Sequence, residues 1–313
     1  MSKYIFHEGQ LAKNFKPVFE RFLFNEERHL HSQSLDGWKT FSLIDNRSKL
    51  VFAQVNFHIE NSTASSPYKA PFGSFEFNES LSIEVLFNFL VEVENKLKEQ
   101  GVIKVAIKDV PHLYRPQESA ILSVLLMDLN FEVVKSEINS SIVVDEVLWR
   151  DKISQAELKR LRRCEREQLI FQSLGLSELE EVYNFTRECR HERDAELSVT
   201  YASLKYTVEK CPDDFLLFGV FQKKELIASA ISVRVTNSII YNFYHAHRKS
   251  SDQLSPIVFL LDNQYSYCRQ NGFRLLDLGT SSLENKTNFS LLNFKTQVGG
   301  IFSMKLTFEK ELQ

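Results

Sequence analysis

The feature that most constrains the fold is an order of elements that occurs twice along the chain. In each half a long helical segment ends at a glycine, and a strand, a second helix and a further strand follow. The two glycines, Gly101 and Gly272, lie 171 positions apart, and the segments "LNFEVVKS" and "VGGIFSMK" follow them at nearly the same offset. A repeat of this length far exceeds a solenoid unit and indicates duplication of a whole domain.

The chain length agrees with duplication, because 313 residues can form two domains that each bury a core. We place the boundary between residues 145 and 154. The predicted domains are therefore an N-terminal, degenerate domain over residues 1–150 and a C-terminal domain over residues 151–313 that carries the candidate active site.

The expected elements alternate between strands and helices, which predicts an α/β (α+β) protein with mixed sheets. Strands are expected at 38–45, 49–59, 102–107, 131–137 and 140–145 in the first half, and at 214–222, 225–235, 238–247, 273–279 and 301–309 in the second. Helices are expected at 82–100 and 118–129, and then at 176–193, 198–211, 255–271 and 288–298.

Composition excludes several classes of protein. A net charge of −3 argues against a broad nucleic-acid footprint, so we expect no DNA partner and only a local contact if tRNA binds. The four cysteines lack metal-ligand spacing, so no metal site is expected. The start of the chain has no signal-peptide pattern, and the apolar runs are too short to span a bilayer. These features predict a cytoplasmic protein without a membrane span.

Three segments near the C-terminus carry a resemblance to a known family: "FRLLDLGTSS", "NFSLLNFKTQVGG" and the lysine-bearing strand "FSMKLTF". Together with the duplication, they resemble the GNAT acyltransferase fold and, more narrowly, the FemAB-like tandem-GNAT transferases. The resemblance covers most of the chain by topology and is motif-specific from Tyr241 to Lys305. It implies two tandem GNAT-like domains, each with a mixed central sheet flanked by helices.

The stretch "YHAHRKSSDQLSP" falls where GNAT enzymes hold the CoA pyrophosphate on a turn of the form Gln/Arg-x-x-Gly-x-Gly/Ala. Arg248, Ser251 and Gln253 occupy the motif positions, and Ser255 occupies the helix N-cap, so these four residues are the candidate cofactor-binding set. Both glycines are replaced, and Asp252 adds a negative charge. The turn therefore predicts weak or absent CoA binding, and an ordinary connection without a ligand is the alternative.

The donor expected from the resemblance is either an acyl-CoA or an aminoacyl-tRNA, since Fem-type transferases use aminoacyl-tRNA. The sequence shows no long charged helical hairpin of the kind that forms the tRNA-binding insert of Fem enzymes, which weighs against tRNA. No cofactor is expected with certainty.

Lys295 falls near the middle of the apolar arc of the expected helix 288–298, which also holds Phe289, Leu291, Leu292, Phe294 and Val298. A lysine at such a place must extend to solvent, find a partner or face a cavity. The resemblance implies that Phe294 and Lys295 match a Phe-Lys pair in which the lysine stabilises the oxyanion of the transferred carbonyl. A structural lysine that pairs with Asp277 is the alternative.

Asp277 is unusual because it interrupts an otherwise apolar strand and therefore needs a partner, and a structural ion pair or a bond to a loop N–H is favoured over a catalytic role. His245 and His247 share one side of the preceding strand, with Tyr244 on the other side. His245 is our candidate for the group that accepts a proton from an attacking amine. Tyr244, Asp277 and Phe294 are candidate substrate-binding residues in this half.

In the first half the loop "SSPYKAPFGS" combines a restrained backbone with aromatic and basic side chains. Tyr68, Lys69 and Phe72 are candidates for contact with the acceptor, and a merely rigid loop is the alternative. The charged segment "SQAELKRLRRCEREQ" is expected to be a solvated helix face with i,i+4 ion pairs, rather than a binding patch for RNA or acidic lipid.

Two functions are therefore compatible with the sequence. The first is an acyl- or aminoacyl-transferase that moves an activated acyl group to an amine acceptor, which could be a small molecule or resemble a cell-wall precursor. Lys295 would stabilise the oxyanion, and His245 would take the proton. The second is a catalytically inactive tandem-GNAT module that binds a metabolite or a protein partner.

Overall fold

The computed structural model describes residues 4–283 and 286–312. The chain forms two compact units: unit 1 is Met1–Glu137 with Ser303–Gln313, and unit 2 is Ile138–Phe302. These units do not coincide with the predicted division at residue 150. Unit 1 ends earlier and also includes the C-terminal segment, because that segment completes its sheet.

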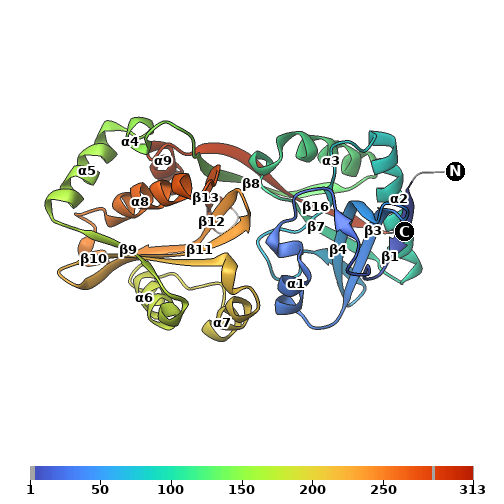
Figure 1. The fold of residues 1–313 in the computed structure, drawn as a ribbon, viewed down its shortest axis with the longest axis horizontal. Helices are drawn as coiled ribbons and strands as arrows, with labels where there is room; N and C mark the ends of the chain where they lie inside the picture. Colours follow the sequence, from blue (N-terminus) through green and yellow to red (C-terminus); the bar gives the residue numbers. More distant parts are fainter. Residues whose placement is uncertain (1–3, 284–285, 313) are drawn as a thin grey trace. The chain divides into compact units, whose positions relative to one another are not determined.

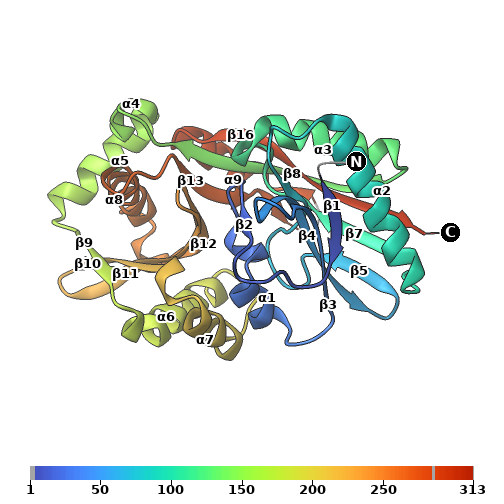
Figure 2. The same ribbon diagram turned by 45° about the vertical axis from the view of Figure 1, so that its right-hand side comes forward.

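Unit 1 is built on a mixed sheet whose strands follow the order β1-β3-β4-β5-β7-β16, with the short strands β2 and β6 paired to β4. Figure 2 shows β3, β4, β5 and β7 next to one another. The strands are β1 (Ile5–Glu8), β2 (Lys16–Pro17), β3 (Trp38–Asp45), β4 (Leu50–Glu60), β5 (Thr63–Ser66), β6 (Glu76–Phe77), β7 (Lys104–Lys108) and β16 (Ile301–Glu311). The helices are η1 (Leu23–Asn25), α1 (Glu27–Gln33), α2 (Ile83–Glu99), η2 (His112–Tyr114) and α3 (Pro116–Asp128).

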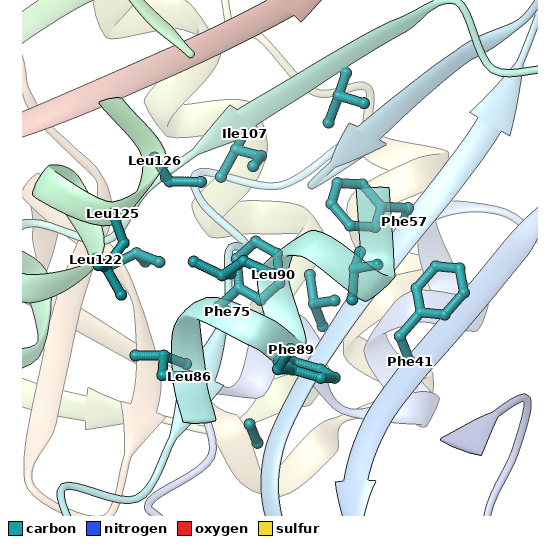
Figure 3. Close-up of a cluster of buried hydrophobic side chains, with 14 of the residues drawn as sticks. Phe41, Phe57, Phe75, Leu86, Phe89, Leu90, Ile107, Leu122, Leu125 and Leu126 are labelled. Atoms are coloured by element: carbon teal, nitrogen blue, oxygen red, sulfur yellow. The ribbon is translucent and has the colours of Figure 1, made fainter. Parts of the chain in front are cut away.

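The core of unit 1 lies between this sheet and the helices α2 and α3. Phe41 and Phe57 from the sheet meet Phe89 and Leu90 from α2 and Leu122 from α3 (Figure 3). Phe75 packs edge to face against both Phe57 and Phe89, with 6.2 Å and 6.0 Å between the ring centroids.

Unit 2 has a sheet of the order β8-β13-β12-β11-β10-β9. Helices α5 and α8 lie on one side of it, and α6 and α7 lie on the other (Figure 1). The strands are β8 (Glu132–Val143), β9 (Ile170–Leu174), β10 (Phe215–Gln222), β11 (Glu225–Thr236), β12 (Ile239–His247), β13 (Leu275–Thr280), β14 (Ser282–Leu283) and β15 (Lys286–Thr287). The helices are α4 (Trp149–Lys152), α5 (Gln155–Arg166), η3 (Leu176–Glu178), α6 (Leu179–His191), α7 (Tyr201–Lys210), η4 (Pro212–Asp214), η5 (Lys249–Ser251), α8 (Pro256–Gln270) and α9 (Phe289–Gln297).

The pairing pattern is the same in the two units. In unit 1, β3, β4 and β5 pair antiparallel, β5 pairs parallel with β7, and β7 pairs antiparallel with β16. In unit 2, β10, β11 and β12 pair antiparallel, β12 pairs parallel with β13, and β13 pairs antiparallel with the end of β8. The glycines at the ends of α2 and α8 also match, since Gly101 and Gly272 have φ values of +77° and +76°.

The chain exchanges one strand between the repeated patterns. Strand β8 follows the helices of the first half, yet residues 139–143 pair with β13 of unit 2. Strand β16 follows the helices of the second half, yet residues 307–311 pair with β7 of unit 1. This exchange is the reason why unit 1 contains the C-terminal strand.

Most expected elements are confirmed within one or two residues at each end. One correction concerns the strands expected at 131–137 and 140–145, which form the single strand β8 because the polar stretch between them continues the extended backbone. Within the part of the chain that the structure describes, none of the helices is both long and apolar enough to cross a bilayer.

Candidate active site

The candidate site of unit 2 lies where two neighbouring strands separate. Strands β12 and β13 pair in parallel only from Ile239 to Tyr241, opposite Leu275 to Asp277. Beyond this point β12 continues to His247 and pairs only with β11, with a bulge at Phe243 that lets neighbouring side chains face the same opening. A cavity of about 570 Å³ lies where the two strands have separated.

Residues from seven helices and strands line this cavity. They include Tyr241, Phe243, His245 and His247 of β12, Gly279 and Thr280 of β13, Arg190 of α6, Ser255 before α8, Phe294 and Lys295 of α9, and Arg160 of α5. All of them belong to unit 2.

Lys295 is one of the most buried side chains of the chain, with 2% of its surface exposed. Its Nζ donates hydrogen bonds to the carbonyl oxygens of Gly279 (2.7 Å) and Thr280 (2.9 Å). Gly279 has φ of +74°, a backbone conformation that suits glycine. Two of the three N–H donors of the ammonium are thus used, which leaves one for a ligand in the cavity.

Burial lowers the pKa of Lys295 from 10.5 to about 8, and the charge of Asp277 opposes this shift. The ammonium form therefore predominates at neutral pH. A half-satisfied ammonium on the wall of a cavity can stabilise negative charge that develops on a bound carbonyl oxygen.

Asp277 is buried, and its Oδ1 accepts hydrogen bonds from Asn139 Nδ2 (2.9 Å) and from the backbone N–H of Gly279 (2.7 Å). It influences Lys295 by charge and fixes the turn whose carbonyl groups hold Lys295. Asp277 is not among the residues that line the cavity, so the structure gives it a supporting place rather than the substrate contact that we predicted.

The two histidines of β12 both line the cavity. Burial, together with the positive charges of Arg190, Lys295 and His247, lowers the pKa of His245 to about 3. Its imidazole is therefore neutral at pH 7. His247 differs because its Nε2 bonds Asp252 Oδ1 at 2.8 Å, although burial still lowers its pKa.

Tyr244 lies on the opposite side of β12, as strand alternation predicts, and it does not line the cavity. Its hydroxyl lies 2.8 Å from the hydroxyl of Ser198 and accepts from the backbone N–H of Val199 at 3.1 Å. The side chain anchors the segment before α7, which corrects the prediction that Tyr244 contacts the substrate.

The apolar arc of α9 faces the cavity as well as the core. Phe294 and Leu291 line the cavity beside Lys295. Phe289, at the start of the helix, is instead 72% exposed, which corrects its assignment to a buried arc.

The turn between β12 and α8 is closed by its own hydrogen bonds. The backbone N–H groups of Arg248, Lys249, Ser251, Asp252, Leu254 and Ser255 already donate to oxygen atoms of the protein. Two carboxylates also stand at the turn: Glu192 Oε2 accepts from the N–H of Lys249 at 2.7 Å, and Asp252 pairs with Arg193 at 2.6 Å. A pyrophosphate would have to displace these oxygen atoms.

The predicted cofactor-binding side chains are spread around this turn. Arg248 pairs with Glu188 at 2.8 Å and lies over the ring of Phe185, away from the cavity. Ser251 is buried and Gln253 is exposed. Ser255 alone of the four lines the cavity, at the N-cap of α8 with φ of +54°, and its hydroxyl makes no cap hydrogen bond.

The acceptor candidates of the first half belong to unit 1. Tyr68 stacks on the ring of His58 at 3.8 Å between centroids, and Lys69 Nζ lies 4.4 Å from the centre of the Tyr68 ring. Phe72 is only 2% exposed and packs edge to face against Phe22. Phe72 is therefore a core residue of unit 1, which corrects its prediction as a substrate contact.

The charged helix α5 carries fewer internal ion pairs than expected. Glu157 is buried and pairs with Arg160 at 2.5 Å, one turn along the helix. Glu165 pairs with Arg150 outside the helix at 2.8 Å. The side chains of Lys159, Arg162 and Arg166 are exposed.

Sequence reasoning missed the arginines of the cavity. Arg190 and Arg193 lie at the end of α6 and just beyond it, in the segment "RECRHERD", and Arg160 lies on α5. The sequence shows these residues only as members of charged helices. The packing of α5 and α6 against the sheet decides which cations face the cavity.

Comparisons with known proteins address the fold. No family model matches the chain, and a search of curated proteins finds no match. Among solved structures, FemX is similar over 98% of this chain and 97% of its own, with a TM-score of 0.74 and 13% identity. L-PGS from Bacillus licheniformis is similar over 84% of this chain and 82% of its own (TM-score 0.56, 12% identity).

A conserved protein of unknown function from Bacteroides thetaiotaomicron covers 94% of this chain and 92% of its own, with a TM-score of 0.59 and 9% identity. At these identities the similarity establishes the fold and not the activity. Together with the repeated strand pattern, it shows that this chain has the same tandem GNAT fold as FemX.

Proposed function

We propose that unit 2 catalyses transfer of an activated acyl or aminoacyl group to an amine. The observation that carries the proposal is Lys295, a buried ammonium with one N–H donor left over on the wall of a cavity of about 570 Å³. The Fem resemblance of the Phe294-Lys295 pair supports the same role.

In the proposed reaction the neutral amine attacks the carbonyl carbon of the donor, and a C–N bond forms. The carbonyl oxygen gains negative charge, which the free N–H of Lys295 stabilises. When the intermediate collapses, the bond from carbon to the leaving oxygen or sulfur breaks, and the leaving atom keeps the electron pair. The proton released from the amine nitrogen must reach that leaving atom.

His245 is the proposed group for this proton transfer. Its imidazole is neutral at pH 7 and can accept a hydrogen bond from the amine. A pKa of about 3 means that the imidazole holds a proton only weakly. His245 would therefore hold the proton only briefly and pass it on to the leaving group, and it is not a strong base in the free protein.

We further propose that the donor is an aminoacyl ester, such as aminoacyl-tRNA, rather than an acyl-CoA. The turn from Arg248 to Ser255 is a poor cradle for a pyrophosphate, because six of its eight amides already donate to protein oxygen atoms and Asp252 and Glu192 add negative charge. The fold similarity to FemX agrees with this choice of donor class, and the acceptor is proposed to be an amine of the cell-wall-precursor type.

The decisive experiment is single-turnover transfer with labelled aminoacyl-tRNA and labelled acetyl-CoA, with a mixture of amines as acceptors. Lys295→Met keeps the aliphatic bulk, so we expect the protein to stay folded while the transfer rate falls by about a hundredfold or more. Lys286→Met is the matched control, since Lys286 is an exposed lysine of β15.

Thermal melting of the same variants separates catalysis from stability. If Lys295→Met melts much lower but keeps its rate per folded molecule, Lys295 is structural, and the inactive binding module becomes the better description. Label transfer from neither donor in the wild-type protein would point to the same conclusion.

A further inference from the structure

The cavity of unit 2 carries an excess of positive charge. Four cationic side chains line it, from Arg160, Arg190, Arg193 and Lys295, and Asp252 is the one carboxylate among the lining residues that the structure describes. Three of these cations have protein partners: Arg160 pairs with Glu157, Arg193 pairs with Asp252, and Lys295 bonds two carbonyl groups.

Arg190 is different from the other three. It lies in the last turn of α6, is half-buried and faces the cavity. Its guanidinium makes no hydrogen bond or ion pair with any residue in the ranges 4–283 and 286–312. By contrast, Arg193, three residues along the chain, donates to the carbonyl of His247 at 2.9 Å and to Asp252 at 2.6 Å.

Within the described part of the chain, Arg190 therefore has no protein acceptor for its guanidinium, although its side chain is half-buried. Desolvating a guanidinium without a partner lowers stability, and the five N–H donors of the group are not used by the protein. A cation without a protein acceptor on the wall of a substrate-sized cavity is explained if a ligand supplies the missing acceptors.

We propose that Arg190 is the anchor of an anion subsite, where its guanidinium binds a carboxylate or phosphate group of a substrate next to the reacting centre. The proposal rests on the transfer function proposed above and names the chemistry of the ligand. A planar guanidinium binds either anion through two parallel hydrogen bonds, which would fix the orientation of the substrate relative to Lys295.

Binding of an anion at this position would also change His245. The positive charges that act on its imidazole come from Arg190 on α6 and Lys295 on α9, and His247 on its own strand adds to them only when it is protonated. A bound anion offsets these charges, so the pKa of His245 should rise from about 3 when the subsite is filled. Binding of the substrate would thereby make His245 a stronger proton acceptor for the attacking amine.

The anion could belong to either substrate. A donor of the aminoacyl-RNA type has a phosphate on its terminal nucleotide, and an acceptor of the amino-acid or peptide type has a carboxylate near its amine. Adenosine 5′-monophosphate can represent the first source, and glycylglycine can represent the second. Inorganic phosphate tests the shared chemistry.

The test compares Arg190→Gln with Arg187→Gln, which removes the same charge from an exposed position of α6 that does not line the cavity. Binding of the three probes is measured by calorimetry, and the imidazole signals of His245 are followed by NMR. We expect Arg190→Gln to weaken the binding of phosphate and of one of the two larger probes about tenfold or more. Arg187→Gln should leave the binding of all three within about twofold.

Stability supplies a second readout. Arg190→Gln should melt at the wild-type temperature or higher, whereas Arg193→Gln should melt lower because Asp252 and the His247 carbonyl lose a donor. Equal binding of all probes by the wild type and Arg190→Gln would overturn the subsite. Failure of every probe to bind the wild-type protein at about 10 mM would overturn it as well.

The two proposals fail separately. If Lys295→Met loses transfer while Arg190→Gln keeps normal Michaelis constants for donor and acceptor, the anion subsite is wrong and the transfer function stands. If Arg190→Gln loses anion binding while Lys295→Met keeps its transfer rate, the cavity binds an anion but Lys295 does not act on the carbonyl.

Discussion

At the scale of single residues, the sequence identifies polar side chains at apolar positions, such as Lys295 and Asp277, but it does not show which atoms they bond to. Periodicity places Lys295 on the apolar arc of its helix and leaves open whether it extends to solvent, finds a partner or faces a cavity; the structure buries it. Its partners could not be predicted, because Gly279 and Thr280 become neighbours only when β13 ends in a turn beside α9. The alternative considered from the sequence, a pair between Lys295 and Asp277, is replaced by bonds from Lys295 to carbonyl groups beside Asp277, which itself accepts from the N–H of Gly279.

The protonation of Lys295 gives a prediction for the pH dependence of transfer. Because burial lowers the pKa to about 8, the cation is lost as the pH rises through that value, and oxyanion stabilisation is lost with it. We expect the single-turnover rate to stop rising near pH 8 and then to fall, although the acceptor amine becomes more nucleophilic. The ¹³Cε shift of Lys295, titrated by NMR, should give the same midpoint.

Lys295→Arg serves as the comparison for this profile, since a guanidinium stays protonated over the whole range. Its rate should continue to rise above about pH 8, even if the absolute rate is lower. Parallel profiles for the wild type and this variant would exclude titration of Lys295 as the cause of the decline.

At the scale of elements, the connection between the end of β12 and the start of α8 is the basis for the donor class that we propose. The sequence predicted the helix start at Ser255-Pro256 correctly, and α8 begins at Pro256. It also showed that the glycines of the phosphate turn are replaced. It could not show that a one-turn helix (Lys249–Ser251) follows β12 and engages the amides of the turn with its own carbonyl groups.

Coenzyme A should therefore bind weakly or not at all. Titration calorimetry of the wild-type protein with CoA and acetyl-CoA is expected to give no dissociation constant below about 100 μM, because the pyrophosphate meets engaged amides and the carboxylates of Asp252 and Glu192. Micromolar affinity that disappears in Ser251→Leu would show instead that this turn holds the cofactor. ATP serves as a control for non-specific phosphate binding.

At the scale of the whole molecule, the duplication could be read from the sequence and the strand exchange could not. The spacing of Gly101 and Gly272 indicates that the same order of helices and strands occurs twice, and the strand pairing of both units agrees with this duplication. Which sheet receives the last strand of each copy depends on long-range pairing that local patterns do not encode. The predicted boundary at residue 150 therefore separates β7 from its partner β16.

The exchange makes the core of unit 1 depend on the end of the chain. Phe308 of β16 is fully buried in the core cluster of unit 1, whereas Phe302 at the start of the same strand is 44% exposed. Phe308→Ala should destabilise unit 1 by about 3 to 5 kcal/mol, the usual cost of removing a buried phenyl ring. Phe302→Ala is the matched control and should cost less than about 1 kcal/mol.

Hydrogen exchange followed by mass spectrometry measures this effect in the intact chain. In Phe308→Ala, amides of β4, β7 and α2 should lose protection, because these elements pack around Phe308 in one core cluster. A fragment of residues 1–150, which lacks β16, should show even less protection in these elements than Phe308→Ala. If that fragment instead protects β7 and α2 as well as the intact protein does, β16 is not needed for unit 1, and residues 1–150 form an independent domain after all.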